Sequence, residues 1–303
     1  MKTTQTRFLS SLLIGVLALC AALHFSSDQA SAPVPETYRI LIANDDGIEH
    51  EGLLELVKAM SKVGEVVVTA PPANRSGASH SSTMLSTSMK IEQRTIEGAS
   101  EAWAVDGTPS DCVAFGVRHL GTEKPFDLVV SGINGGSNVG LVAHYSGTVG
   151  AAMEGAMNGI PSFAVSMERG RGANHFKLAA AFAADFARKM LEEEADATVI
   201  YNINVPSASP AEITGVAIAE MGGLYLEAPR FNVYEDGGET FVRAALQRGS
   251  DFPAGSDTAA YYEGKITIAP LRVNHTDSAK LVELIAWQLE PPTPKEALIY
   301  SGE

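Results

Sequence analysis

Short apolar runs alternate with segments of helical periodicity over most of the chain. The runs have the length of buried strands and lie at residues 38–43, 65–70, 127–131, 162–166 and 198–205. Between them, apolar residues recur at helical spacing, most clearly at residues 52–60 and 176–191. Because a helix that joins two buried strands implies a parallel connection, the pattern predicts an α/β fold with a mainly parallel sheet.

Beyond Pro206 the pattern changes to shorter strand-like pieces separated by glycine turns. These pieces lie at residues 214–220, 241–246 and 265–269, and a final helix is predicted at 278–289. Short strands of this kind are typical of antiparallel pairing. We therefore expect a folded body from residue 37 to 303, whose C-terminal part, at about 207–303, is an antiparallel extension that acts as an oligomerisation arm.

The first 36 residues differ from the rest. Lys2 and Arg7 precede an apolar stretch at 8–25, which is the order of regions in an export signal, and residues 26–36 have the composition of a linker. A cleaved signal peptide is the favoured interpretation. An uncleaved single-span anchor is the alternative, because the stretch is near the lower limit of about 17 residues for spanning a membrane. Either interpretation places the folded part in the periplasm or another extracytoplasmic compartment.

Composition narrows the classes of function. With 303 residues, of which 45% are hydrophobic, the chain can bury a full core. Its formal net charge of -14 argues against binding of duplex nucleic acid through a broad basic surface. Small anionic substrates remain compatible, because a cation or a helix N-terminus creates a local positive site. Cys20 lies in the export segment, so we expect no internal disulfide in the mature chain, and we expect Cys112 to be a buried core residue.

The polar turn Asn44-Asp45-Asp46-Gly47 directly follows the first apolar run. Ligands of open α/β sheets bind beyond the carboxyl ends of the strands. Two adjacent carboxylates at that place would repel each other, and a divalent cation would remove the conflict. A plain turn, in which Asp45 or Asp46 caps the next helix, explains the same residues. These four residues alone leave both interpretations open.

Two further polar loops follow strands of the same predicted sheet. The loop at 74–80 contains Ser76 and Ser79, and the loop at 131–136 contains Asn134. Because the loops meet at one sheet edge, we expect a hydroxyl and a carboxamide beside the two carboxylates. Such oxygen donors suit magnesium, manganese or calcium better than zinc. The alternative is that the serines cap turns and Asn134 stabilises a glycine turn.

A fourth loop leads into a predicted helix at Ser146-Gly147-Thr148. Backbone N–H groups and the helix dipole favour an anion such as phosphate at a helix N-terminus. A cation beside a phosphate site indicates phosphoryl transfer, in which the cation polarises the P–O bond and activates a water. Ser146 acting only as an N-cap is the alternative.

These loops and several other segments together resemble the SurE family of survival-protein nucleotidases. The resemblance extends in order from about Tyr38 to near the last helix. The matching segments are residues 39–47, 74–79, 106–113, 130–136, 145–155, 202–206, 255–260 and 266–271.

The resemblance implies a metal-dependent phosphomonoesterase that acts on nucleoside 5′-monophosphates, on some 3′-monophosphates, and in some members on polyphosphate. It implies a Rossmann-like three-layer fold with a swapped C-terminal arm, in a homodimer or homotetramer, and one Mg²⁺ or Mn²⁺ per subunit. The implied metal ligands are Asp45, Asp46, Ser76 and Asn134. The implied phosphate pocket contains Ser146, Gly147 and Thr148, with Asn44 and Thr108 in its supporting shell.

His80 departs from the family pattern, which usually has asparagine after the preceding Ser79. A histidine there could contact phosphate together with Ser79, or it could be a plain surface residue. The export segment is the second departure, because family members commonly lack a leader.

We therefore expect an exported metallophosphatase in which Asp45 and Asp46 are the catalytic residues and a metal-activated water attacks the phosphate. An aspartyl-phosphate route with Asp45 as nucleophile is the mechanistic alternative. A non-catalytic nucleotide- or metal-binding protein on the same fold is the functional alternative, and an assembly protein a weaker one. A dinucleotide-binding enzyme is disfavoured, because the first turn lacks the required glycine motif.

Overall fold

The computed structural model describes residues 37–168, 175–250 and 252–291. Contacts divide the chain into Met1–Glu36 and Thr37–Glu303, and every described residue belongs to the second unit. The predicted export segment at 8–25 and the linker at 26–36 lie outside the described residues. Within the described residues, no helix is both long and apolar enough to cross a membrane.

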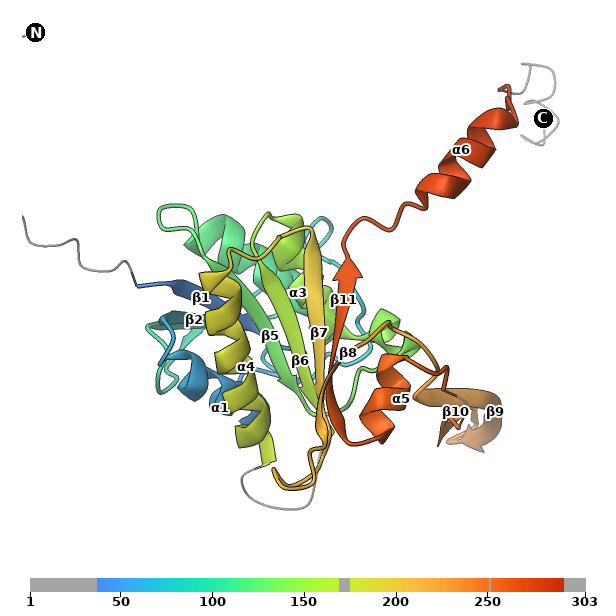
Figure 1. The fold of residues 1–303 in the computed structure, drawn as a ribbon, viewed down its shortest axis with the longest axis horizontal. Helices are drawn as coiled ribbons and strands as arrows, with labels where there is room; N and C mark the ends of the chain where they lie inside the picture. The colour runs from blue at the N-terminus through green and yellow to red at the C-terminus, as the bar shows by residue number, and fades with distance from the viewer. Residues whose placement is uncertain (1–36, 169–174, 251, 292–303) are drawn as a thin grey trace, which may run out of the picture. The chain divides into compact units, whose positions relative to one another are not determined.

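A nine-stranded sheet forms the centre of the fold, with the strand order β3-β4-β2-β1-β5-β6-β7-β11-β8 (Figure 1). The strands are β1 (Arg39–Ala43), β2 (Glu65–Ala70), β3 (Ile91–Arg94), β4 (Glu101–Val105), β5 (Leu128–Asn134), β6 (Ser162–Met167), β7 (Val199–Val205), β8 (Gly215–Ile218), β9 (Leu226–Asp236), β10 (Glu239–Arg248) and β11 (Lys265–Arg272). Strands β4, β2, β1, β5, β6 and β7 run parallel to one another. The predicted mainly parallel sheet is therefore confirmed.

Helices α1 and α4 pack on one face of this sheet, and α2 and α3 pack on the other. The helices of the described residues are α1 (Glu51–Met60), α2 (Pro109–Phe115), α3 (Gly147–Met157), α4 (His175–Glu192), α5 (Asp257–Tyr262) and α6 (Ser278–Ala286), with a π-helical turn at Gly116–Leu120 and a 3₁₀ turn at Leu141–Tyr145. Alternate residues of β1 face opposite ways: Ile40 belongs to the core under α1 and α4, and Leu41 to the core under α2 and α3. This arrangement gives three layers, with α1 and α4 in front of the strands in Figure 1.

The C-terminal part differs from the predicted antiparallel arm. Strand β11 pairs antiparallel with β7, and β8 pairs parallel with β11, so both strands extend the main sheet. Only β9 and β10 form a separate two-stranded antiparallel sheet. The prediction of a wholly antiparallel extension was wrong for β8, because a short strand carries no signal for the direction of its partner.

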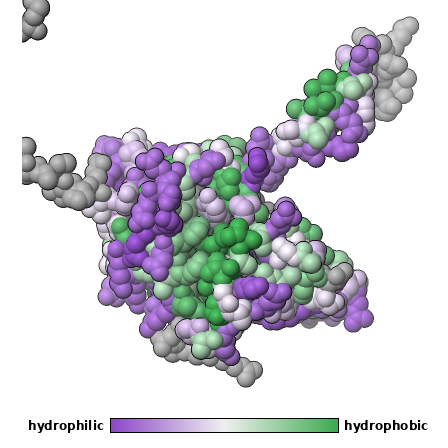
Figure 2. All heavy atoms as spheres, viewed as in Figure 1, coloured by the Kyte–Doolittle hydropathy of each residue, from purple (hydrophilic) through white to green (hydrophobic). Residues whose placement is uncertain are grey.

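Apolar side chains are exposed on α6 and on the β9–β10 hairpin. On and just after α6 they are Leu281, Val282, Leu284, Ile285 and Trp287, and on the hairpin they include Phe231, Val233, Tyr234 and Val242. Figure 2 shows hydrophobic surface on α6 beside hydrophilic surface of the same helix. None of the residues of α6 is buried within the single chain. The apolar face of this helix therefore does not pack into the core of the described subunit.

Candidate active site

The predicted oxygen donors line one cavity at the carboxyl end of the parallel strands. The cavity has a volume of about 850 Å³, and its lining includes Asp45, Asp46, Ser76 and Asn134. The aspartates follow β1, Ser76 lies in the loop after β2, and Asn134 is the last residue of β5. The structure therefore brings together the donors that the sequence placed at three separate strand ends.

The turn after β1 is held by the side chain of Asn44. Its amide nitrogen donates to the carbonyl oxygen of Gly47 at 2.8 Å, and its amide oxygen accepts from the Gly47 N–H at 3.2 Å. Gly47 has a φ of 112°, and a Cβ there would lie 3.3 Å from the backbone of Ala73. A glycine is therefore required for the turn that carries both aspartates. Asn44 is fully buried and supports the cavity from behind.

Asp45 is buried, with only 3% of its surface exposed. Burial raises its pKa to about 6, and the charge of Asp46 acts in the same direction, while a hydrogen bond from Thr148 opposes the shift. That bond joins Thr148 Oγ1 to Asp45 Oδ1 at 2.7 Å. The backbone N–H groups of Asp45 and Thr148 also lower the pKa, but all these donors together do not offset the effect of burial.

The carboxylate of Asp46 is oriented by both neighbouring loops. Its Oδ2 atom accepts from the N–H of Gly135 at 2.7 Å, and its Oδ1 atom accepts from the amide nitrogen of Asn74 at 3.2 Å. His50 Nδ1 lies 3.7 Å from Oδ2. Asp46 therefore ties the turn after β1 to the loops that carry the other two donors.

The donor set fits a hard divalent cation. The amide nitrogen of Asn134 donates to the carbonyl oxygen of Gly136 at 2.6 Å, which leaves the amide oxygen as the end that can bind a cation. The described part of the chain contains no group of three or more histidine, cysteine, aspartate or glutamate side chains that could hold a metal. Two carboxylates, a hydroxyl and an amide suit Mg²⁺ or Mn²⁺ better than zinc, which prefers nitrogen and sulfur ligands.

Helix α3 begins at the wall of the same cavity. Ser146 is its N-cap, and Ser146 Oγ accepts from the N–H of Val149 at 3.1 Å. A Cβ on Gly147 would lie 2.9 Å from the Cβ of Asp45, so a glycine permits this close approach. The first N–H groups of a helix have no intrahelical acceptor. The backbone N–H of Thr148 donates to the carboxylate of Asp45, and of these helix-start residues Ser146 lines the cavity whereas Gly147 and Thr148 do not. The positive end of the helix therefore lies next to the aspartates, where it favours an anion.

The remaining predicted site residues lie around this cavity. Ser79 and His80 line a neighbouring cavity of about 710 Å³, and Ser146 lines both cavities. Thr108 lines neither of them: it caps α2 by accepting from the N–H of Asp111 at 3.2 Å, and its hydroxyl donates to the carbonyl oxygen of Ser81 at 2.7 Å. Thr108 and Asp111 form a capping box at the start of α2.

Part of the cavity wall was not anticipated from the sequence. Tyr145 lies on it beside Ser146, and the β9–β10 hairpin contributes Leu226, Pro229 and Leu246. These side chains are a mostly apolar surface facing the oxygen donors. The sequence offered little signal for them, because β9 contains Pro229 and charged residues and was not recognised as a strand.

Comparisons with known proteins agree on one family. Residues 40–227 match the family model described as survival protein SurE. The chain is 38% identical over 255 residues to a 5′-nucleotidase SurE of Rhodopirellula baltica, covering 84% of this chain and 100% of that protein. It is 40% identical over 262 residues to a 5′-nucleotidase SurE of Desulfatibacillum aliphaticivorans, covering 84% and 99%. The crystal structure of SurE protein from Aquifex aeolicus superposes with a TM-score of 0.70 at 35% identity, covering 82% of this chain and 99% of that one.

Proposed function

Because the chain belongs to the SurE family of 5′-nucleotidases, we propose that it hydrolyses nucleoside 5′-monophosphates at the cavity beyond β1 and β5. One observation carries the proposal. The carboxylates of Asp45 and Asp46 line a single cavity together with Ser76, Asn134 and the N-cap of α3.

In this proposal one set of cavity residues binds the cation and another binds the phosphate. Asp45, Asp46, Ser76 and Asn134 would hold one divalent cation, Mg²⁺ or Mn²⁺, in each subunit. When bound, such a cation neutralises phosphate charge and lowers the pKa of a water. The N–H groups at the start of α3 bind and orient the phosphate oxygens.

We assign Asp45 to the cation, and the hydrogen bond from Thr148 Oγ1 to its Oδ1 atom at 2.7 Å would orient the carboxylate. The alternative is that the other oxygen attacks phosphorus and forms an aspartyl-phosphate. The stereochemical course at phosphorus, followed with a substrate whose phosphoryl group is isotopically chiral, separates the two routes. Inversion supports a single direct attack by water, and retention supports two successive displacements through the covalent intermediate.

Phosphate release from AMP tests the proposal. The purified protein should release phosphate with added Mg²⁺ or Mn²⁺, and excess EDTA should abolish the release reversibly. Saturation with metal and AMP without any release would overturn the enzymatic function and favour a binding protein on the same fold. A panel of 3′-monophosphates, polyphosphate and simple phosphomonoesters then defines the range of substrates.

We also infer a homodimer or homotetramer assembled through the C-terminal part. The apolar side chains exposed on α6 and on the hairpin support this inference, because a subunit in water gains by covering them. Sedimentation of the full chain should give a mass of two or four subunits. The double variant I285E/W287E should shift it toward the monomer, whereas E283K on the same helix should not.

Finally, we propose that the chain is exported through its N-terminal segment, with phosphate esters outside the cytoplasm as its substrates. Lys2, Arg7 and the apolar stretch at 8–25 support the proposal. Cell fractionation should recover the activity in the extracytoplasmic fraction, and N-terminal sequencing of that material distinguishes a cleaved signal from an anchor. Recovery in the cytoplasm would contradict export.

A further inference from the structure

We propose that His80 and Glu154 form a positioning pair, which holds the loop carrying Ser76 and Ser79 against the start of α3. The inference rests on the proposed function, since the loop supplies a cation ligand and borders the phosphate site. It concerns a histidine at the position where the family usually has asparagine.

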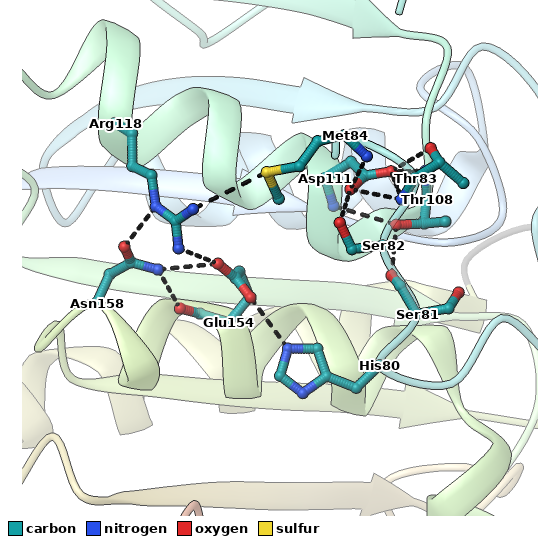
Figure 3. Close-up of polar contacts among 10 residues, drawn as sticks. All are labelled: His80, Ser81, Ser82, Thr83, Met84, Thr108, Asp111, Arg118, Glu154 and Asn158. Carbon is teal, nitrogen blue, oxygen red and sulfur yellow. Dashed lines mark hydrogen bonds and ion pairs between the residues drawn. The ribbon is translucent and has the colours of Figure 1, made fainter. Parts of the chain in front are cut away.

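Figure 3 shows the pair and its surroundings. His80 Nε2 lies 3.1 Å from Glu154 Oε2, at the end of a loop that faces α3. The other carboxylate oxygen of Glu154 accepts from Arg118 Nη2 at 2.8 Å and from the amide nitrogen of Asn158 at 3.1 Å. Only 8% of the Glu154 side chain is exposed. Arg118 belongs to the π-helical turn and Asn158 caps the C-terminus of α3, so among these partners His80 is the connection of Glu154 to the loop.

The partners of Glu154 stabilise its ionised form. The hydrogen bond from His80 lowers the pKa of Glu154, and the bond from Asn158 and the charge of Arg118 act in the same direction, against the opposing effect of burial. Glu154 is therefore an ionised anchor within α3. Its helix begins at Ser146, so the anchor and the proposed phosphate site belong to one rigid element.

The loop between Ser76 and His80 is in close contact with this helix. Ser79 has a φ of 53°, a left-handed conformation that a serine seldom adopts. Its hydroxyl donates to the carbonyl oxygen of His144 at 2.6 Å, and its N–H donates to that of Tyr145 at 3.2 Å. A Cβ on Gly150 would lie 2.4 Å from the Ser79 carbonyl oxygen. Such a conformation persists only when the surroundings hold it, and His80 is the next residue along the chain.

A second anchor fixes the far end of the same loop. Ser82 Oγ and Thr83 Oγ1 donate to the carboxylate of Asp111 at 2.6 and 2.7 Å (Figure 3). This anchor lies on α2, and the His80 anchor lies closer in sequence to Ser76 and Ser79. Loss of His80 should therefore increase the mobility of residues 76–80, while the bonds to Asp111 still hold Ser82 and Thr83 in place.

The test is the substitution His80→Ala, with His80→Gln as the conservative variant, because an amide can keep the hydrogen bond to Glu154. In the metal-free protein, H80A should raise the hydrogen-exchange rates of the amides at 76–80 about tenfold, and H80Q by less than twofold. The Kd for Mn²⁺, measured by calorimetry without substrate, should rise by roughly 5- to 20-fold in H80A. KM for AMP should rise with it, and kcat should change less.

Controls separate positioning from a general loss of stability. His119 is exposed and stacks on Phe115 outside the group that contacts Glu154, so H119A should leave exchange and Mn²⁺ binding unchanged. Glu154→Gln provides a second route if H80A does not fold, and it should change the same amides in the same direction. Because His80 acts through Glu154, the double variant H80A/E154Q should be no worse than the more affected single variant.

Unchanged exchange at 76–80 and an unchanged Kd for Mn²⁺ in H80A would overturn the positioning role. Absence of phosphate release from the wild-type protein would instead overturn the proposed function, because exchange and metal binding are measured without turnover. A rise in KM alone, with exchange and Mn²⁺ binding at wild-type values, would also contradict positioning and favour direct contact of His80 with substrate.

Discussion

Two buried aspartates in this molecule are held in opposite ways. Asp111 is completely buried on α2, yet its carboxylate accepts hydrogen bonds from the side chains of Ser82 and Thr83 and from the N–H of Thr108. Burial tends to raise its pKa, but the bonds from Ser82 and Thr83 outweigh this effect and lower the pKa to about 2. Asp45 is buried almost as deeply, and its pKa is instead raised to about 6.

The difference lies in what each carboxylate has as partners. Asp111 has enough donors to remain charged without help, which makes it a structural residue. Asp45 accepts from the hydroxyl of Thr148 and from backbone N–H groups of Asp45 and Thr148, but these donors do not offset its burial, and a second carboxylate is its neighbour. A raised pKa of this kind in a cavity supports the proposal that a cation binds there.

The largest effect is expected on catalysis. Asp45→Asn or Asp46→Asn should lower kcat/KM for AMP by on the order of a thousandfold or more, because loss of cation stabilisation is worth several kcal/mol. The measurement is phosphate release at saturating Mn²⁺. Asp106→Asn is the matched control, since Asp106 is exposed and pairs with Arg75, and it should stay within about twofold of wild type. Activity retained in D45N would refute the assignment of the site.

Asp111→Asn should have its main effect on folding. Replacing this carboxylate leaves N–H and O–H donors without a suitable acceptor, and the free energy of unfolding should fall by about 2–4 kcal/mol. Urea unfolding followed by circular dichroism measures the change. Ser82→Ala removes a single bond and should cost only about 1 kcal/mol. If D111N leaves the free energy of unfolding unchanged, the hydrogen bonds of Asp111 contribute less to stability than this comparison requires.

Asp45→Asn should have the opposite effect on stability, raising the free energy of unfolding of the metal-free protein. The folded protein keeps the proton on Asp45 up to about pH 6, whereas the unfolded chain releases it near the ordinary value of 3.8, so stability falls as pH rises through this window. In EDTA at pH 8, Asp45→Asn should therefore raise the free energy of unfolding by about 1–3 kcal/mol. At pH 3.5 the gain should disappear, and a loss of stability at both pH values would contradict the comparison.

A further effect is expected at the one side-chain donor of Asp45, Thr148. Thr148→Val removes a hydroxyl that orients the carboxylate, and should lower the affinity for Mn²⁺ by roughly 10- to 100-fold, as for other residues that orient metal ligands. Thr148→Ser keeps the hydroxyl and should bind Mn²⁺ within about threefold of wild type. Calorimetry in the absence of substrate makes both measurements.

Much of the fold could be predicted from the sequence because its signals are local. The buried strands β1 and β2 are continuous apolar runs, and the start of α2 is marked by Thr108, Pro109 and Asp111 in a capping box. The C-terminal elements could not be predicted equally well. Strand β8 owes its place to pairing with β11, and α5 is only 6 residues long, so neither has a pattern of its own.

The candidate site also has parts that could be predicted from local sequence signals and parts that could not. Asp45, Asp46 and Asn134 follow strong strands, so their convergence could be inferred from the topology of a parallel sheet. The bond between Thr148 and Asp45 and the apolar wall of Leu226 and Leu246 depend on contacts between residues far apart in sequence. A single sequence gives no register for such contacts.

The pairing of the β9–β10 hairpin has a consequence for how this enzyme can diversify. The hairpin forms its own two-stranded sheet, and the cation ligands are attached to the nine-stranded sheet. Leu226, Pro229 and Leu246 nevertheless face the same cavity as those ligands. One wall of the cavity is thus built on the main sheet and the facing wall on a separate hairpin. A change in the hairpin could therefore alter one wall without moving the oxygen donors on the other.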